Sequence, residues 1–122
     1  RSWLAINRVL AGAGPGGLYV FDEVDSGVGG GIAEVIGQKI HQVAAYHQVL
    51  CITHQAQIAA FADDHFFVSK QVDEGRTSSH IRALDLSSRA DELARMMGGV
   101  TIDGATRMAA RELLQRTQGG RL

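Results

Sequence analysis

The chain has 122 residues, a formal net charge of −1 and one cysteine, Cys51. Its length allows one domain or part of one, and its near-zero charge excludes a strong overall field for nonspecific binding of nucleic acid or membranes. The lone cysteine excludes an internal disulfide framework and fits a reducing cytosol. No apolar run approaches membrane-spanning length, and no signal peptide is visible. Because the chain begins without an initiator Met and inside a helical pattern, we expect residues 1–122 to be a fragment.

The first half of the chain predicts a helix, followed by two buried strands around a second helix. Apolar residues recur at helical spacing within residues 1–11: Trp3, Ile6 and Leu10. Residues 18–22 form a short apolar run between glycine clusters, which is typical of a strand buried on both faces. Residues 32–46 form an amphipathic helix with one apolar stripe: Ile32, Val35, Ile36, Ile40 and Val43. Residues 48–53 form the second strand, and the strand–helix–strand spacing predicts a right-handed crossover between parallel strands.

A short helix and a hairpin are predicted next. Residues 55–62 are expected to be helical. Strands 65–70 and 78–84 flank a turn at residues 73–75, and this short connection indicates an antiparallel pair.

The chain is predicted to end with two helices. Residues 88–97 begin with Ser88 and Asp91 in the positions of a capping box, and their inward face is expected to be Ala90, Leu93, Ala94 and Met97. Residues 103–117 form the last helix, with four residues inward: Ala105, Met108, Ala109 and Leu113. The sequence therefore predicts an α/β fold, with a mainly parallel sheet flanked by helices, a C-terminal β-hairpin and two helices.

Two adjacent carboxylates, Asp22 and Glu23, stand where the first predicted strand leaves the sheet. Open α/β sheets bind ligands at this carboxyl edge. Successive strand side chains point to opposite faces, so one acid can hold a hard cation such as Mg²⁺ while the other orients or deprotonates a water. This is the form of a Walker B motif. The alternative is a pair of solvated acids that open a loop.

His54 ends the second strand as the acids end the first, so we expect both at the same edge of the sheet. An imidazole there can hydrogen-bond a phosphate oxygen or an attacking water; a histidine bonded to backbone is the alternative. The glycine-rich loop 27–31 does not fit a dinucleotide fingerprint, because it lacks the final small residue and nearby acids would crowd a pyrophosphate. Cys51 points to the other face of the strand and is expected to be buried and inert.

The remaining histidines and the last arginines have no ligand-like spacing. We expect the histidines to be surface or partly packed residues: His41, His47, His65 and His80. We expect the arginines to form a solvated face near a helix C-terminus rather than a DNA-binding patch: Arg107, Arg111, Arg116 and Arg121.

The motifs together resemble a known family. Residues 18–30, Leu-Tyr-Val-Phe-Asp-Glu-Val-Asp-Ser-Gly-Val-Gly-Gly, are similar to the Walker B motif and D-loop of the RecN DNA-repair ATPases, SMC-like members of the ABC ATPase superfamily. Residues 51–59 resemble their switch-histidine loop, and residues 67–70 and 92–99 resemble the strand and helix that follow. The similarity covers essentially the whole chain in order. Gly29, where most ABC proteins have the last Asp of the D-loop, is shared with RecN-like proteins.

The resemblance implies a role for each matching residue. Asp22 would help to hold the Mg²⁺ of MgATP through water, Glu23 would polarise the hydrolytic water, and His54 would sense the γ-phosphate. The D-loop would contact a partner head at an ATP-dependent dimer interface through four residues: Asp25, Ser26, Gly27 and Gly29. The implied cofactors are ATP and Mg²⁺.

The sequence contains no GxxxxGK[ST] loop, no LSGGE-like motif and no long heptad run. We therefore expect the C-terminal, Walker B half of an ABC-type head, inactive alone. The implied partners are the N-terminal half of the same head, a second head and, through the complete protein, DNA. The implied task is recombinational repair of double-strand breaks in a bacterial cytoplasm, at the nucleoid and without membrane contact. The alternatives are the head of another SMC-like ATPase and a noncatalytic α/β interaction module.

Overall fold

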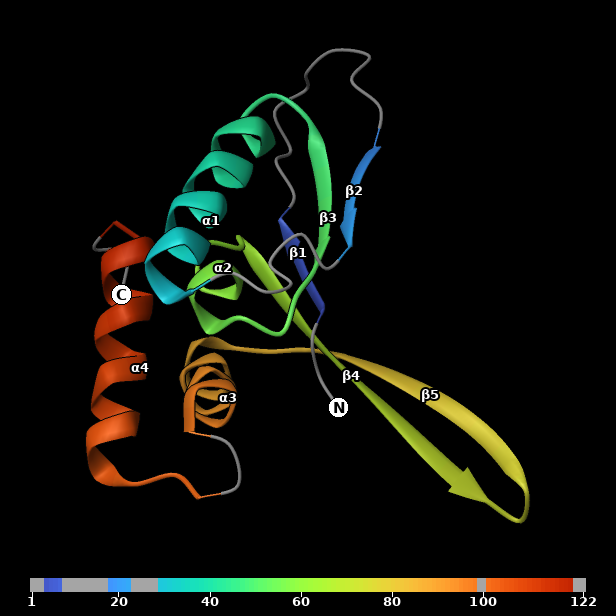
Figure 1. The fold of residues 1–122 in the computed structure, drawn as a ribbon. Helices are drawn as coiled ribbons and strands as arrows, with labels where there is room; N and C mark the ends of the chain where they lie inside the picture. The colour runs from blue at the N-terminus through green and yellow to red at the C-terminus, as the bar shows by residue number, and fades with distance from the viewer. Residues whose placement is uncertain (1–3, 8–17, 23–28, 99–100, 120–122) are drawn as a thin grey trace.

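A computed structural model describes residues 4–7, 18–22, 29–98 and 101–119. Figure 1 shows a sheet with the helices packed to one side and a long hairpin that projects from the body. The elements are, in order, β1 (Leu4–Asn7), β2 (Leu18–Asp22), α1 (Gly30–Ala44), β3 (Gln48–Ile52), α2 (Ala56–Ala59), β4 (Asp64–Asp73), β5 (Arg76–Ala83), α3 (Leu86–Gly98) and α4 (Gly104–Thr117). The predicted α/β class, the C-terminal hairpin and the two last helices are confirmed.

The five strands have the order β2-β3-β1-β4-β5 and include one parallel pair. β2 and β3 run parallel and are connected through α1, so the predicted parallel strand–helix–strand unit is confirmed. The β3–β1, β1–β4 and β4–β5 pairs are antiparallel. The prediction of a mainly parallel sheet is therefore wrong, because β1 enters between β3 and β4 against the direction of both.

Residues 4–7 form β1 and do not belong to the helix predicted for residues 1–11. The other residues of that predicted helix lie outside the described part of the chain. β1 pairs with β3 on one side and with β4 on the other. Pairing on both sides satisfies its backbone N–H and C=O groups. In so short a segment this hydrogen bonding favours a strand over the helix that the spacing of three apolar residues predicts.

β2 lies at the edge of the sheet. Leu18 and Val20 are each 56% exposed, and Phe21 alone in this strand is partly buried. The predicted strand is confirmed, but its predicted burial on both faces is wrong. The cause is that β2 has one neighbouring strand, β3, and that its Phe21 packs against the cluster formed by α1, β3 and α2.

α1 packs through only part of the predicted stripe, since Ile40 is buried and Ile36 packs against the same cluster. Its buried residues are Ala33, Gly37, Ile40 and Ala44. Three residues of the predicted stripe are exposed: Ile32, Val35 and Val43. α2 causes this rotation by its close approach, since a Cβ on Gly37 would lie 2.6 Å from Cδ2 of Phe61 and 3.1 Å from the carbonyl oxygen of Gln57. Small residues therefore occupy the contact, and the larger aliphatic side chains lie to either side.

The β4–β5 hairpin is longer than predicted and reaches far beyond the helices (Figure 1). Pairing continues out to Asp73 opposite Arg76. The two turn residues have positive φ, 49° at Glu74 and 76° at Gly75, as a two-residue hairpin turn of the type I′ class requires. Every residue from 70 to 83 is exposed.

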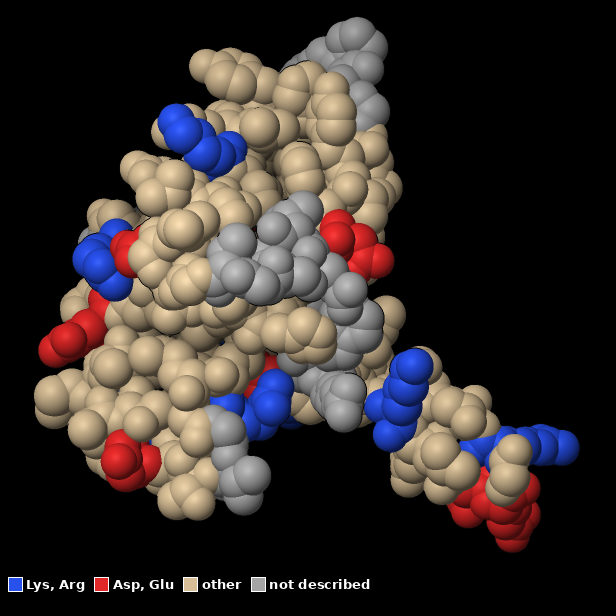
Figure 2. Space-filling model, viewed as in Figure 1, with Lys and Arg blue, Asp and Glu red and all other residues tan. Residues whose placement is uncertain are grey.

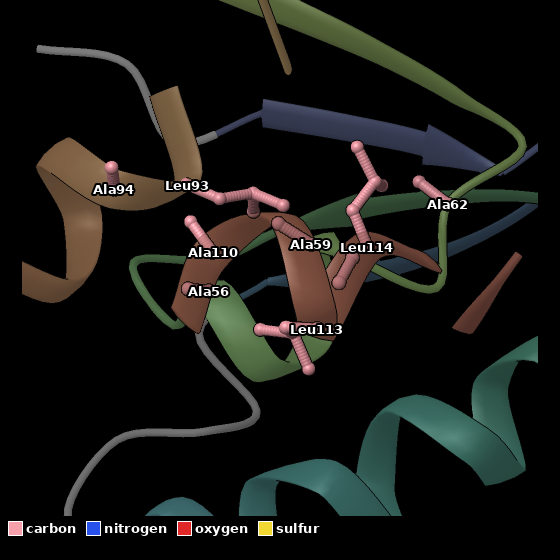
Figure 3. Packing of buried hydrophobic residues seen from close by; sticks show 9 residues of the cluster. Ala56, Ala59, Ala62, Leu93, Ala94, Ala110, Leu113 and Leu114 are labelled. Carbon is pink, nitrogen blue, oxygen red and sulfur yellow. The ribbon is translucent and has the colours of Figure 1, made fainter. Parts of the chain in front are cut away.

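α3 and α4 close a second core over α2 (Figure 3). Its nine buried residues are Ala56, Ala59, Ala60, Ala62, Leu93, Ala94, Ala110, Leu113 and Leu114. Of the residues predicted to point inward from α4, Leu113 is buried but Ala105 and Met108 are exposed. The helix turns toward α3 through Ala110 instead, because alanine permits a close helix–helix approach.

Both C-terminal helices begin at an aspartate. The side chain of Asp85 accepts the Ser88 backbone N–H at 2.8 Å, and that of Asp103 accepts the Thr106 N–H at 2.8 Å. These hydrogen bonds lower the pKa of both carboxyl groups. The predicted capping box that starts at Ser88 is therefore wrong, since Asp85 takes the capping position three residues earlier.

His65 is buried, against the prediction that it is a surface or partly packed residue. It is 2% exposed, and neither of its ring nitrogens has a hydrogen-bond partner. Burial, followed by the positive charge of Arg89, lowers the pKa of His65 to about 4, with Glu92 acting in the opposite direction. The prediction that Cys51 is buried is confirmed.

Candidate functional site

The parallel pairing of β2 and β3 brings two predicted site residues to one edge of the sheet. Asp22 is in register with Ile52, the last residue of β3, and His54 follows two residues later. Both Asp22 and His54 are exposed. The expectation that they share the carboxyl edge is confirmed, and their chemical roles remain predictions.

Thr53 shapes the turn that presents His54. Thr53 is fully buried at the end of β3, and its Oγ1 accepts the backbone N–H of Gln55 at 3.0 Å. This side chain-to-backbone bond across two residues closes a tight turn around His54. The turn directs the chain into α2 and leaves the imidazole at the surface.

α2, which follows this turn, is held by the ends of two other helices. The carbonyl of Ala60 accepts Thr117 Oγ1 at 2.7 Å and Gln118 Nε2 at 2.9 Å. The carbonyl of Ala62 accepts Arg89 Nη2 at 2.9 Å and Gln118 Nε2 at 3.2 Å. These donors satisfy the carbonyl of Ala60, the C-cap of α2, and that of Ala62, two residues further on. They connect the histidine turn to α3 and to the end of α4.

The loop between β2 and α1 carries most of the other predicted residues. Glu23, Asp25, Ser26 and Gly27 lie outside the described residues. Gly29 is exposed, with extended backbone, and is the N-cap of α1. Because a glycine cap has no side chain, no side-chain bond closes this helix start. The loop that begins after Asp22 therefore ends at the positive end of a 15-residue helix.

A cleft of about 710 Å³ opens at the same helix start. Gly30 and Gly31 form one wall, Gln57 reaches in from α2, and α4 contributes the opposite wall. An ion pair crosses between the walls, with Arg116 Nη1 3.1 Å from Glu34 Oε1. The amide of Gln57 is close to the glycines: a Cβ on Gly30 would lie 3.3 Å from its Nε2.

The arginines of α4 do not gather into a basic patch. Arg116 pairs with Glu34, and Arg107 lies 3.7 Å from Asp91. Figure 2 shows acidic and basic side chains mixed over the visible face and at the projecting hairpin. The expectation of a solvated face is supported for these two residues; Arg121 lies outside the described residues.

Within the described ranges, no three His, Cys, Asp or Glu side chains form a group that could hold a metal ion. A carboxylate at an exposed strand end, as at Asp22, is chemically suited to a hard cation, directly or through water. Glu23 and Asp25, which follow it in the sequence, lie outside the described residues. No helix in the described part of the chain is long and apolar enough to cross a membrane.

The fold and the site define a class: an α/β unit with an acid and a histidine at the carboxyl ends of two parallel strands. No family model matches the chain. DNA repair protein RecN of Xylella fastidiosa (strain Temecula1) is 46% identical over 118 residues, which cover 97% of this chain and 21% of that protein. RecN of Deinococcus radiodurans is 46% identical over 114 residues, covering 93% and 20%. RecN of Bacillus subtilis (strain 168) is 40% identical over 116 residues, covering 95% and 20%.

Over nearly its whole length, this chain is therefore a relative of one segment of DNA repair protein RecN, and the resemblance drawn from the motifs is confirmed. The chain spans about one fifth of the length of these relatives.

Three positioning residues were not singled out from the sequence. Thr53 could have been found, because a threonine at a strand end, two residues before a helix, is typical of such turns. Gln118 and Arg89 gave no signal, since their hydrogen bonds join segments 56–58 and 27 residues apart.

Proposed function

We propose that this chain is the Walker B part of a RecN-type ATPase head that binds and hydrolyses MgATP during repair of DNA double-strand breaks. The observation that carries the proposal is the parallel register of β2 and β3, which places Asp22 and the turn at His54 on one sheet edge. The 40–46% identity to RecN proteins supports the same assignment. The remainder of such a protein would supply the phosphate-binding loop.

Each residue has one task in this proposal. Asp22, exposed at the end of β2, would help to hold Mg²⁺ through water, and the cation would offset charge on the phosphates. Glu23 is the next residue along the chain and polarises the attacking water. His54 contacts the γ-phosphate or that water, from a turn fixed by Thr53 and by the helix ends that hold α2.

The D-loop residues are proposed to meet a second head. Asp25, Ser26, Gly27 and Gly29 precede α1, and the start of this helix borders the 710 Å³ cleft. Amide groups at a helix start suit a negatively charged or polar partner. ATP-dependent closure of two heads across this loop would link hydrolysis to the holding of DNA.

The test uses a full-length RecN protein that carries these 122 residues. Glu23→Gln keeps the size of the side chain but removes the base, so it should lower ATP turnover by about 10²–10⁴-fold while MgATP still binds. Glu74→Gln, at the exposed tip of the hairpin, is the matched control and should turn over normally. Near-normal turnover in Glu23→Gln would refute the role of Glu23.

His54→Ala separates a phosphate-sensing role from general packing. It should lower turnover more than it lowers ATP affinity, and it should leave ADP affinity unchanged, because ADP has no γ-phosphate. His80→Ala, on the exposed hairpin, is its control. Equal losses of affinity for ATP and ADP would show that His54 acts through packing.

A further inference from the structure

α2 lies between the two segments that carry the predicted site residues. It begins two residues after His54, and Gly29 of the proposed D-loop immediately precedes α1. The two helices meet at the level of the backbone, because a Cβ on Gly37 would lie 3.1 Å from the carbonyl oxygen of Gln57 and 3.1 Å from Cα of Ile58. Figure 1 shows the start of α1 beside α2. Since closely packed elements transmit displacement, a shift of α1 is felt by α2.

Gln57 is the residue of α2 that faces the cleft beside α1. The other three residues of this helix are buried: Ala56, Ile58 and Ala59. Gln57 is partly buried and lines the cleft of about 710 Å³ together with Gly30 and Gly31. A Cβ on Gly30 would lie 3.3 Å from Nε2 of Gln57, whereas a Cβ on Gly31 would have nothing within 4 Å. The amide of Gln57 therefore lies directly against the first residue of α1.

A neutral amide suits this position chemically. The first backbone N–H groups of a helix have no acceptor within the helix, and Gly29 adds no side-chain acceptor. The amide of Gln57 can accept through its oxygen and donate through its nitrogen, so it can bond polar groups at a helix start. A carboxylate could also accept, but it would add negative charge to a cleft that Glu34 and Glu112 already line.

The far end of α2 is fixed more firmly than its near end. The carbonyl of Ala60 is fully buried with its residue and accepts hydrogen bonds from Thr117 and Gln118 at the end of α4. The near end of α2 begins at the turn of His54, which is exposed. A displacement of Gln57 by α1 would therefore be taken up mainly in the turn that carries His54.

We propose that Gln57 is a positioning residue that links the start of α1 to the turn of His54. This inference rests on the proposed ATPase function and names a further residue of the same site. When a second head contacts the D-loop at Gly29, the start of α1 shifts against the amide of Gln57, and α2 passes the displacement to His54, three residues earlier in the chain. The imidazole then reaches the γ-phosphate or the attacking water in the paired head. Gln57 thus acts on turnover through His54 and does not itself hold the nucleotide.

The first test uses Gln57→Met in a full-length RecN protein that carries these 122 residues. The substitution keeps an unbranched side chain but removes the amide. It should lower ATP turnover about fivefold, the effect of one net hydrogen bond, and leave the affinities for MgATP and MgADP unchanged. Gln42→Met, at an exposed position of α1, is the matched control. Normal turnover in Gln57→Met would overturn the proposal, and equal losses of affinity for both nucleotides would do so by showing a role in packing alone.

A double-mutant cycle tests whether Gln57 acts through His54. In a His54→Ala background, Gln57→Met should cause no further loss of turnover, because the side chain that it positions is absent. The same fivefold loss in both backgrounds would overturn the proposal. Normal turnover in His54→Ala alone would refute the proposed role of His54 and this inference with it. A defect in His54→Ala together with normal turnover in Gln57→Met would overturn this inference and leave the proposed function standing.

The two adjacent glycines of α1 provide a variant that moves the amide without removing it. Gly30→Ala places a methyl group 3.3 Å from Nε2 of Gln57, at the far end of a flexible side chain, so the helix can fold while the amide shifts. Gly31→Ala brings the same gain in helix propensity but meets open space. Turnover in Gly30→Ala should be at least twofold lower than in Gly31→Ala, with equal affinities for MgATP. Equal turnover in the two variants would overturn the proposal.

Discussion

The buried histidine His65 predicts a loss of stability in mild acid. Its pKa is lowered from 6.5 to about 4, with burial as the main cause. A depressed pKa means that the unfolded chain binds the proton more tightly, so stability is complete above pH 6.5 and falls as the pH drops toward 4. The difference between 6.5 and about 4 corresponds to about 3 kcal/mol of stability in full, of which about 2 kcal/mol is lost by pH 5.

The perturbation is His65→Leu, which replaces a ring that has no hydrogen-bond partner with an apolar side chain of similar size. The variant should be about as stable as the wild type at pH 7.5 and should keep the 2 kcal/mol that the wild type loses by pH 5. The difference between the two proteins isolates His65 from the acidic residues that titrate in the same range. His80→Gln, at an exposed position, should behave like the wild type.

Hydrogen exchange of the backbone amides in β4 and α3 measures this effect in a full-length RecN protein. The free energy of local opening is obtained at pH 7.5 and at pH 5, after correction for the intrinsic exchange rate. An equal loss of opening free energy in wild type and His65→Leu would refute the reasoning. It would show that the pKa of His65 is the same in the closed and the open state, either because the ring is solvated in both or because a partner stabilises its proton in the closed state.

Two further predictions concern how α2 is held. Gly37→Ala gains helix propensity of up to about 1 kcal/mol but places a methyl group 2.6 Å from Phe61, so it should destabilise α1 by about 1–2 kcal/mol net. Its control is Gly31→Ala, which meets open space and should be neutral or stabilising. Gln118→Leu removes two buried hydrogen bonds, to the carbonyls of Ala60 and Ala62 just after α2, and should cost about 1–2 kcal/mol. Gln115→Leu, exposed on α4, should cost little. Hydrogen exchange of the α1 and α2 amides measures the change in opening free energy for each variant. Equal changes in Gly37→Ala and Gly31→Ala, or in Gln118→Leu and Gln115→Leu, would contradict the packing described.

The elements that the sequence predicted well have strong local signals. The hairpin was marked by an Asp-Glu-Gly turn between β-forming runs, and its two turn residues do adopt positive φ. The parallel unit was marked by two apolar runs at the spacing of a crossover. The site edge followed from these elements alone, because the ends of adjacent parallel strands meet at one edge.

The predictions are wrong where contacts between distant segments of the chain determine the structure. Residues 4–7 belong to the segment 1–11, whose apolar residues have helical spacing, but they form β1 because two other strands pair with them. The stripe of α1 was assigned by hydrophobicity, yet the approach of Phe61 favours Gly37 and small residues at the contact. The lack of ligand-like spacing predicts a surface or partly packed residue at His65, whereas its burial depends on α3, which begins 21 residues later. No local pattern records these contacts.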